Sequence, residues 1–261
     1  NVSSAPWLPY RALIKRLIVE DGPSSIEAQT FADCTALTEV VLPDSLIAVR
    51  EYGFNNLRNL KSITLPQNLR IIEFCGFSEC VALESITLPD SVTTVGSSAF
   101  SNCYALKSAV LSAGMKTVPN SMFFGDYRLT SVTLPDTLSE IGSSAFSGCT
   151  GLTELVLPEG VTAIGYQAFM NCSGLTEFVI PAGVAEIQFD TFNGCTGLKQ
   201  IHIPEGVTLL ESRAFSGCKL VKEIVLPESV VTIEEQAFAD CKALKKLVLP
   251  DKIASIGKEA F

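Results

Sequence analysis

Nine cysteines are the residues of this 261-residue sequence with the widest range of possible chemistry. Eight of them occupy one repeating position, at intervals of 23 or 46 residues: Cys34, Cys80, Cys103, Cys149, Cys172, Cys195, Cys218 and Cys241. In stacked repeats the Cβ vectors of such a column run side by side, which disfavours disulfides. A zinc site needs ligands that converge on one point, and a stacked column does not converge. We therefore predict buried free thiols that fill space, and no metal site.

Acidic residues form a second periodic set, each directly after a proline: Asp44, Asp90, Asp136, Glu159, Glu205, Glu228 and Asp251. Clustered oxygens suit calcium, so a calcium-binding interpretation exists. An acidic residue after proline is also favoured in a solvated turn, and we prefer this second interpretation.

His202 is the only histidine, and no Ser/Asp or Cys arrangement for nucleophilic catalysis can be drawn around it. We therefore predict a protein that is not an enzyme and that needs no cofactor. A net charge of −9 argues against nucleic acid and against anionic membrane surfaces as partners, because both favour a basic protein surface. No run approaches the roughly 18 apolar residues that span a bilayer, so no transmembrane segment is predicted.

The whole sequence is organised by a period of 23 residues. Phenylalanine recurs at this interval: Phe31, Phe54, Phe77, Phe100, Phe123, Phe146, Phe169, Phe192, Phe215, Phe238 and Phe261. Proline recurs in step from Pro43 to Pro250, with one substitution at Ser112. Fixed periods of this length indicate a solenoid, because no single unit can bury its own apolar face and stacked copies can.

The unit that begins at Leu152 shows the expected elements. The alternation from Leu152 to Leu157 predicts a strand, which ends at a proline because proline cannot donate to a ladder. Residues 158–160 are typical of a turn, 161–164 form a corner with two more inward side chains, and 166–169 are expected to be helix-like. Eleven such strands, from 15–19 to 245–249, predict a parallel sheet on the concave face of a body about 50 Å long.

The unit as a whole resembles the BspA-like, or Treponema pallidum type, leucine-rich repeat family. The resemblance rests on the Leu-x-x-Leu-x-Leu core, the proline after the strand and the Ala-Phe-x-x-Cys segment, and it covers residues 8–261. It implies a leucine-rich repeat solenoid of α/β type. It also implies a bacterial or protist protein that is extracellular or on the cell surface, with host matrix or cell-surface components as possible partners.

Two regions are expected within the chain. Residues 1–14 form an N-terminal cap in which Trp7 covers the first repeat, because terminal repeats are usually atypical. Residues 15–261 form a solenoid of ten to eleven repeats whose C-terminal end lacks a polar cap. We expect the native protein to continue past Phe261 or to cover this end in a contact, since an open core face is unfavourable in water.

Two surfaces are candidates for binding. The first is an outward apolar column on the C-terminal half of the predicted sheet, edged by carboxylates: Val156, Val179, His202 and Val225, with Glu154, Glu177 and Glu223. Exposed apolar patches with polar rims mark interaction sites, although β-propensity also explains outward valines. The second is the pair Tyr104 and Tyr127, because tyrosine is enriched in binding hot spots; filler at a variable loop position is the alternative.

These observations predict a non-enzymatic module that recognises a protein or glycan outside the cell. The alternative is a passive spacer that carries another domain of a longer cell-surface protein. The two interpretations share the same fold, and fold alone does not determine function.

Overall fold

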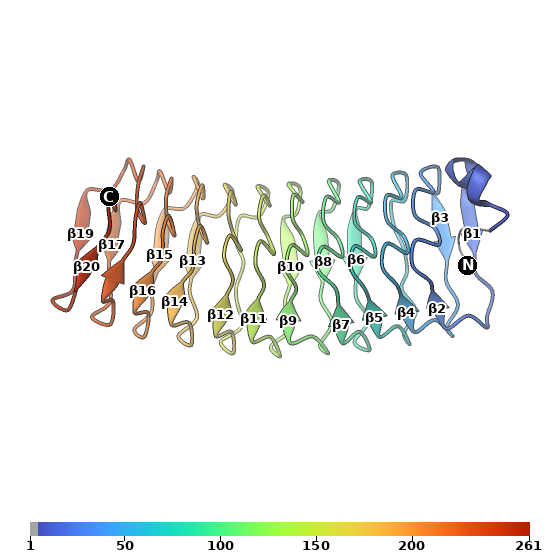
Figure 1. Ribbon diagram of the computed structural model, residues 1–261, viewed down its shortest axis with the longest axis horizontal. Helices are drawn as coiled ribbons and strands as arrows, with labels where there is room; N and C mark the ends of the chain where they lie inside the picture. Colours follow the sequence, from blue (N-terminus) through green and yellow to red (C-terminus); the bar gives the residue numbers. More distant parts are fainter. Residues whose placement is uncertain (1–4) are drawn as a thin grey trace.

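Stacked coils of 23 residues form one elongated solenoid in the computed structural model, which describes residues 5–261. The coils lie side by side along the long axis, with the N-terminal end of the chain at one end of the body and the C-terminal end at the other (Figure 1). We number the coils from Ile14, so that coil 7 is residues 152–174 and coil 8 is residues 175–197. Residues 1–4 of the predicted cap lie outside the described residues.

Short parallel strands follow the predicted sheet surface, which we call the strand face, but they form four separate hydrogen-bonded sheets instead of one. Where neighbouring coils are hydrogen-bonded on this face, residues 23 apart are paired in register, as in Arg16 with Glu39. The three-residue strands are β1 Arg16–Ile18, β3 Glu39–Val41, β6 Ser85–Thr87, β8 Ser108–Val110, β10 Ser131–Thr133, β13 Glu177–Val179, β15 Gln200–His202, β17 Glu223–Val225 and β19 Lys246–Val248. Nine of the eleven predicted positions are therefore strands, while 62–64 and 154–156 pair with neither neighbour.

A second row of strands occupies the segment for which the sequence predicted only a corner. Its two-residue members are β2 Ser25–Ile26, β4 Ala48–Val49, β5 Ile71–Ile72, β7 Thr94–Val95, β9 Thr117–Val118, β11 Glu140–Ile141, β12 Ala163–Ile164, β14 Glu186–Ile187, β16 Leu209–Leu210, β18 Thr232–Ile233 and β20 Ser255–Ile256. The inward member of each pair, such as Ile141, is buried. Stacking these apolar side chains brings successive backbones to ladder distance, which is why a corner becomes a strand.

The segments expected to be helix-like are turns. Gln167 has a φ of 58°, in the left-handed region that interrupts a helix, and the equivalent residue of each described coil has the same conformation. The Gln167 N–H donates to Phe189 O of the next coil at 2.9 Å, so backbone bonds run between coils instead of along a helix. Within residues 5–261 the helix is a single 3₁₀ segment, η2, at Leu8–Leu13.

The phenylalanines form a continuous ladder through the core. Neighbouring rings stack, as in Phe77 and Phe100 with centroids 5.5 Å apart and planes at 3°. Trp7 extends the ladder at the N-terminal end, 6.0 Å from Phe31. Such aromatic pairs add about 0.5–1.5 kcal/mol each beyond the apolar area that they bury.

The cysteine column lies beside this ladder as free thiols, all buried except for the half-buried Cys241. Each thiol from Cys80 onward donates to the carbonyl of the preceding coil's phenylalanine, as Cys172 Sγ does to Phe146 O at 3.0 Å. Asp126 replaces cysteine in coil 5 and is also buried. The thiols therefore both fill space and satisfy backbone carbonyls.

Candidate functional site

The outward column on the C-terminal half of the strand face is strongly exposed. Val156 is 85% exposed, Val179 60% and Val225 59%. Parallel pairing of β13 and β15 places Val179 next to His202. The structure thus brings Val179 and His202 together in one ladder, whereas Val156 stands in the unpaired segment of coil 7.

The three predicted carboxylates have different surroundings. Glu177 Oε1 lies 3.2 Å from His202 Nε2 on the same face. Glu223 pairs with Lys246 of the next coil. Glu154 has no ion-pair partner among residues 5–261. Of these three carboxylates, Glu154 of coil 7 is therefore the one whose charge is not paired within the described residues.

Coil 7 is one of three places where the ladder of the strand face is broken, the others being coil 3 and the junction between β15 and β17. In paired coils the residue equivalent to Leu157 bonds to the next coil, as Leu111 N–H does to Thr133 O at 3.0 Å. The Leu157 N–H lacks such a backbone partner within the described part of the chain. The second row of strands is also interrupted here, because β12 and β14 belong to separate sheets.

A hollow of about 830 Å³ opens at this interruption. Its walls come from coil 7, coil 8 and Pro204 of coil 9, and they include Val156, Leu157, Val179, Ile180 and Pro181. Glu154, Glu159 and Glu177 also line it. The volume falls in the range of about 300–1,000 Å³ that is typical of ligand pockets.

Two residues at this junction depart from the repeat. Phe178 is the one aromatic residue in an inward column of Leu, Ile, Val and Ala, and its ring lies 4.8 Å from that of Phe169 and 4.9 Å from that of Phe192. The Phe178 ring therefore packs against the ladder rings of both coil 7 and coil 8. Ala182 stands in the post-proline position that is acidic in most coils, so a small side chain leaves room beside Glu159.

Tyr104 and Tyr127 form a stacked pair, with ring centroids 5.3 Å apart and planes at 24°. Their exposed fractions are 40% and 46%, so both rings remain accessible. Parallel rings of this kind offer flat apolar faces for contact with a partner. Arg58, which the sequence places in the same column, bonds to Asn56 instead, with its Nε 2.7 Å from Asn56 Oδ1.

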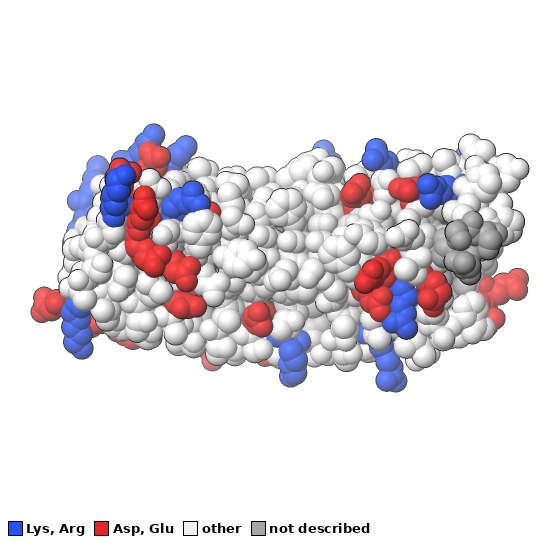
Figure 2. Space-filling model, in the orientation of Figure 1, with Lys and Arg blue, Asp and Glu red and all other residues white. Residues whose placement is uncertain are grey.

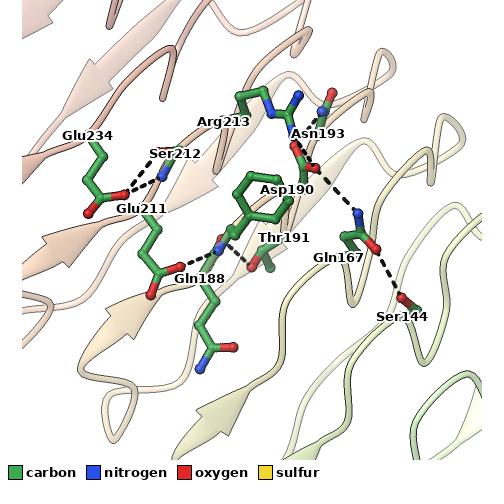
Figure 3. A network of polar contacts seen from close by, with 11 residues as sticks. Ser144, Gln167, Gln188, Asp190, Thr191, Asn193, Glu211, Ser212, Arg213 and Glu234 are labelled. Atoms are coloured by element: carbon green, nitrogen blue, oxygen red, sulfur yellow. Dashed lines mark hydrogen bonds and ion pairs between the residues drawn. The ribbon is translucent and has the colours of Figure 1, made fainter. Parts of the chain in front are cut away.

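A network of polar side chains on the turn side was not predicted from the sequence. It links Ser144, Gln167, Asp190 and Arg213 across four successive coils (Figure 3). Asp190 is buried, and its carboxylate accepts from Arg213 at 3.0 Å and from Asn193 at 2.6 Å. The available sequence signal is that these four residues share one 23-residue column.

The same region contains a second kind of inter-coil contact. The Arg213 guanidinium lies 4.6 Å above the centre of the Phe189 ring. The backbone N–H of Phe189 donates to Glu211 Oε2 at 2.8 Å. Glu234 accepts from the Ser212 N–H in the same way, at 2.9 Å. These contacts link coils 8, 9 and 10 at the turns (Figure 3).

Charge is unevenly distributed on the face seen in Figure 2. Acidic and basic side chains gather toward the two ends of the body, and the middle of this face is largely uncharged. Both signs are present at each end, so the charges shown do not form a continuous basic surface. In residues 5–261, no helix is long and apolar enough to cross a membrane, and no group of three or more His, Cys, Asp or Glu side chains is placed to hold a metal ion.

The sequence matches the family model described as BspA type leucine-rich repeat region, in six copies that together cover residues 24–261. The chain belongs to the BspA-type leucine-rich repeat family. This result confirms the resemblance inferred from the repeat, and the solenoid architecture agrees with it.

Solved structures of similar proteins agree with this family assignment. A leucine-rich repeat protein from Bacteroides ovatus is 25% identical, with 96% of this chain and 76% of that chain covered and a TM-score of 0.66. A leucine-rich cell surface protein from Faecalibacterium prausnitzii is 26% identical, with coverage of 90% and 87% and a TM-score of 0.58. The pneumococcal vaccine antigen PcpA, at 17% identity and a TM-score of 0.52 over 93% and 84%, shares the fold. Among curated proteins, none matches this chain in sequence.

Proposed function

We propose that this protein is a non-enzymatic recognition module that works on the cell surface or in the extracellular space, where it binds a protein or a glycan. The observation that carries the proposal is the outward column of Val156, Val179 and Val225, which is 59–85% exposed in a chain with a net charge of −9. Large apolar side chains that are exposed together on the surface of an acidic protein are characteristic of contact surfaces.

The relatives support the proposed location and the absence of enzymatic activity. One relative at 26% identity is described as a cell surface protein. Leucine-rich repeats present an extended surface built from many coils, which suits recognition of a large partner better than chemistry on a small one. The stacked pair Tyr104 and Tyr127 provides a second contact surface, suited to a sugar ring or a peptide side chain.

The test is binding of the purified protein to immobilised matrix glycoproteins and to a glycan array. Two double variants locate the surface: Tyr104→Ala with Tyr127→Ala, and Val179→Glu with Val225→Glu. All four side chains are exposed, so the fold should tolerate the changes. Saturable binding that one double variant weakens at least tenfold would support recognition and assign the surface.

A passive spacer is the second candidate, favoured by the uninterrupted aromatic ladder from Trp7 to Phe261. A continuous ladder makes a stiff rod, which is what a spacer requires. Absence of binding across the whole panel would contradict recognition and favour the spacer.

A further inference from the structure

The junction between coils 7 and 8 is closed on one side and open on the other. On the turn side, Asn171 N–H donates to Asn193 O at 2.7 Å and Phe169 N–H to Thr191 O at 3.0 Å. On the strand side, one backbone hydrogen bond joins the two coils among the described residues. It runs from Thr176 N–H to Thr153 O and is long, at 3.3 Å. The hollow is therefore a local separation of two coils whose turn sides remain bonded.

The floor of the hollow is apolar. Leu155, Leu157 and Ile180 are buried beneath it, and Val156 projects from its edge as the most exposed large apolar side chain of residues 5–261. A side chain that enters the hollow would bury Val156 and Val179 together. Aliphatic groups gain most from such a contact, because the stabilisation scales with the apolar area removed from water.

The walls carry backbone groups that have no partner. The Leu157 N–H and the Val179 C=O would pair in an intact ladder, as Ile180 N–H and His202 O do at 3.2 Å in the next junction. Neither group is bonded to backbone within the described residues. Unpaired donors and acceptors along a strand edge match the main chain of an extended peptide, which is the basis of strand addition.

Carboxylates surround the apolar floor. Glu154 and Glu159 have no ion-pair partner in residues 5–261, and Glu177 contacts His202. No lysine or arginine lines the hollow. A ligand that is complementary in charge to this surface is cationic. Because the apolar floor lies between the carboxylates, such a ligand carries an apolar group with positive charges on either side of it.

We propose that the hollow between coils 7 and 8 binds an extended peptide segment in which an aliphatic side chain has a lysine or arginine two residues away on each side, because side chains two residues apart share one face of a strand. The aliphatic side chain enters between Val156 and Val179, and the flanking cations meet Glu154 and Glu159. This proposal rests on the recognition function proposed above and narrows it to one ligand class.

The test uses three fluorescein-labelled peptides and fluorescence anisotropy. The probe is Lys-Ser-Val-Ser-Lys, and the comparison peptides are Lys-Ser-Ser-Ser-Lys and Glu-Ser-Val-Ser-Glu. We expect saturable binding of the first peptide, at least tenfold tighter than either of the others. Raising the salt from about 0.05 to 0.5 M should weaken it, because the flanking contacts are exposed ion pairs.

Matched variants assign the binding to the hollow. Val156→Asn should weaken binding roughly fivefold to tenfold and Glu159→Gln roughly threefold, while Val41→Asn and Glu228→Gln, at the same repeat positions of other coils, should leave it unchanged. Equal binding of the three peptides, equal effects of the matched variants, or no binding of the probe at about 1 mM, a concentration that detects even weak complexes, would overturn the proposal. Retained binding to the glycoprotein or glycan panel in that case would leave the recognition function standing.

Discussion

Asp126 is the most informative single position for testing how the core is held together. It replaces cysteine in the buried column, and its exposed fraction is 0%. Its Oδ1 accepts the Cys103 N–H at 2.7 Å, but its Oδ2 has no hydrogen-bond partner among the described residues. Burial raises the pKa of the Asp126 carboxyl well above its usual range, and the Cys103 N–H opposes this only in part.

The structure sets the direction of the pH dependence. The folded state holds a proton on Asp126 that the unfolded chain releases above about pH 3.9. The folded state therefore binds more protons, and the free energy of unfolding must fall as pH rises from about 4 to the folded pKa. The slope from this one group reaches at most about 1.4 kcal/mol per pH unit. At neutral pH, Asp126→Cys removes an unsatisfied buried oxygen, which should stabilise the protein by about 1–3 kcal/mol.

The assay is urea unfolding followed by circular dichroism at a series of pH values from about 4.5 to 8, within which the carboxyl contribution changes. The wild-type protein is compared with Asp126→Cys, Asp126→Asn and the exposed-turn control Asp136→Asn. We expect both Asp126 variants to show a flatter dependence of the unfolding free energy on pH, and the control to follow wild type. Parallel curves for wild type and Asp126→Asn would refute the assignment of a buried, protonated carboxyl.

Three further predictions concern the column, the ladder and the network. Burial raises the pKa of Cys80 to about 12 and that of Cys241 to about 11, so these thiols stay protonated in the folded state while unfolded thiols ionise near pH 8.5. The unfolding free energy should therefore fall as pH rises above about 8.5, and Cys80→Ala should reduce that slope in alkaline urea titrations. Phe169→Ala should cost about 3–5 kcal/mol in urea unfolding, because it leaves a cavity in the aromatic ladder, whereas the exposed Tyr104→Ala should cost less than about 1 kcal/mol. Asp190→Ala should lower the free energy of unfolding by about 2 kcal/mol more than Asp190→Asn does, since asparagine still accepts hydrogen bonds and tolerates the φ of 57° at this position. Equal urea unfolding midpoints for the two variants would contradict a role for the network.

Most of the fold could be predicted from the residues that recur every 23 positions in the sequence. Each Phe of the ladder and each Cys of the column repeats every 23 residues or a multiple of it, and this alone predicts which side chains face inward. The observed burial of Phe146 and Cys149 agrees with that prediction. A repeat can be interpreted in this way because every coil has nearly the same neighbours, so one unit describes the surroundings of all the others.

The candidate site was only partly accessible to the same reasoning. The sequence treats Val156, Val179 and Val225 as equal members of one column, and their outward orientation was predicted correctly. It contains no periodic signal that coil 7 leaves the sheet or that Glu154 stays without an ion pair. These features depend on how far two particular coils lie apart.

The sequence by itself therefore determined the solenoid, its register and the inward and outward faces, because those properties follow from a pattern that recurs in every coil. The tertiary structure decided the second row of strands, the single hydrogen bond of the Asp126 carboxyl group, the network around Asp190 and the hollow between coils 7 and 8. The second row of strands depends on contacts between stacked coils that recur along the solenoid, and the other three features depend on residues that depart from the repeat. Phe178 in a column of smaller side chains is the clearest case, because its contacts with Phe169 and Phe192 exist only once coils 7 and 8 are packed together.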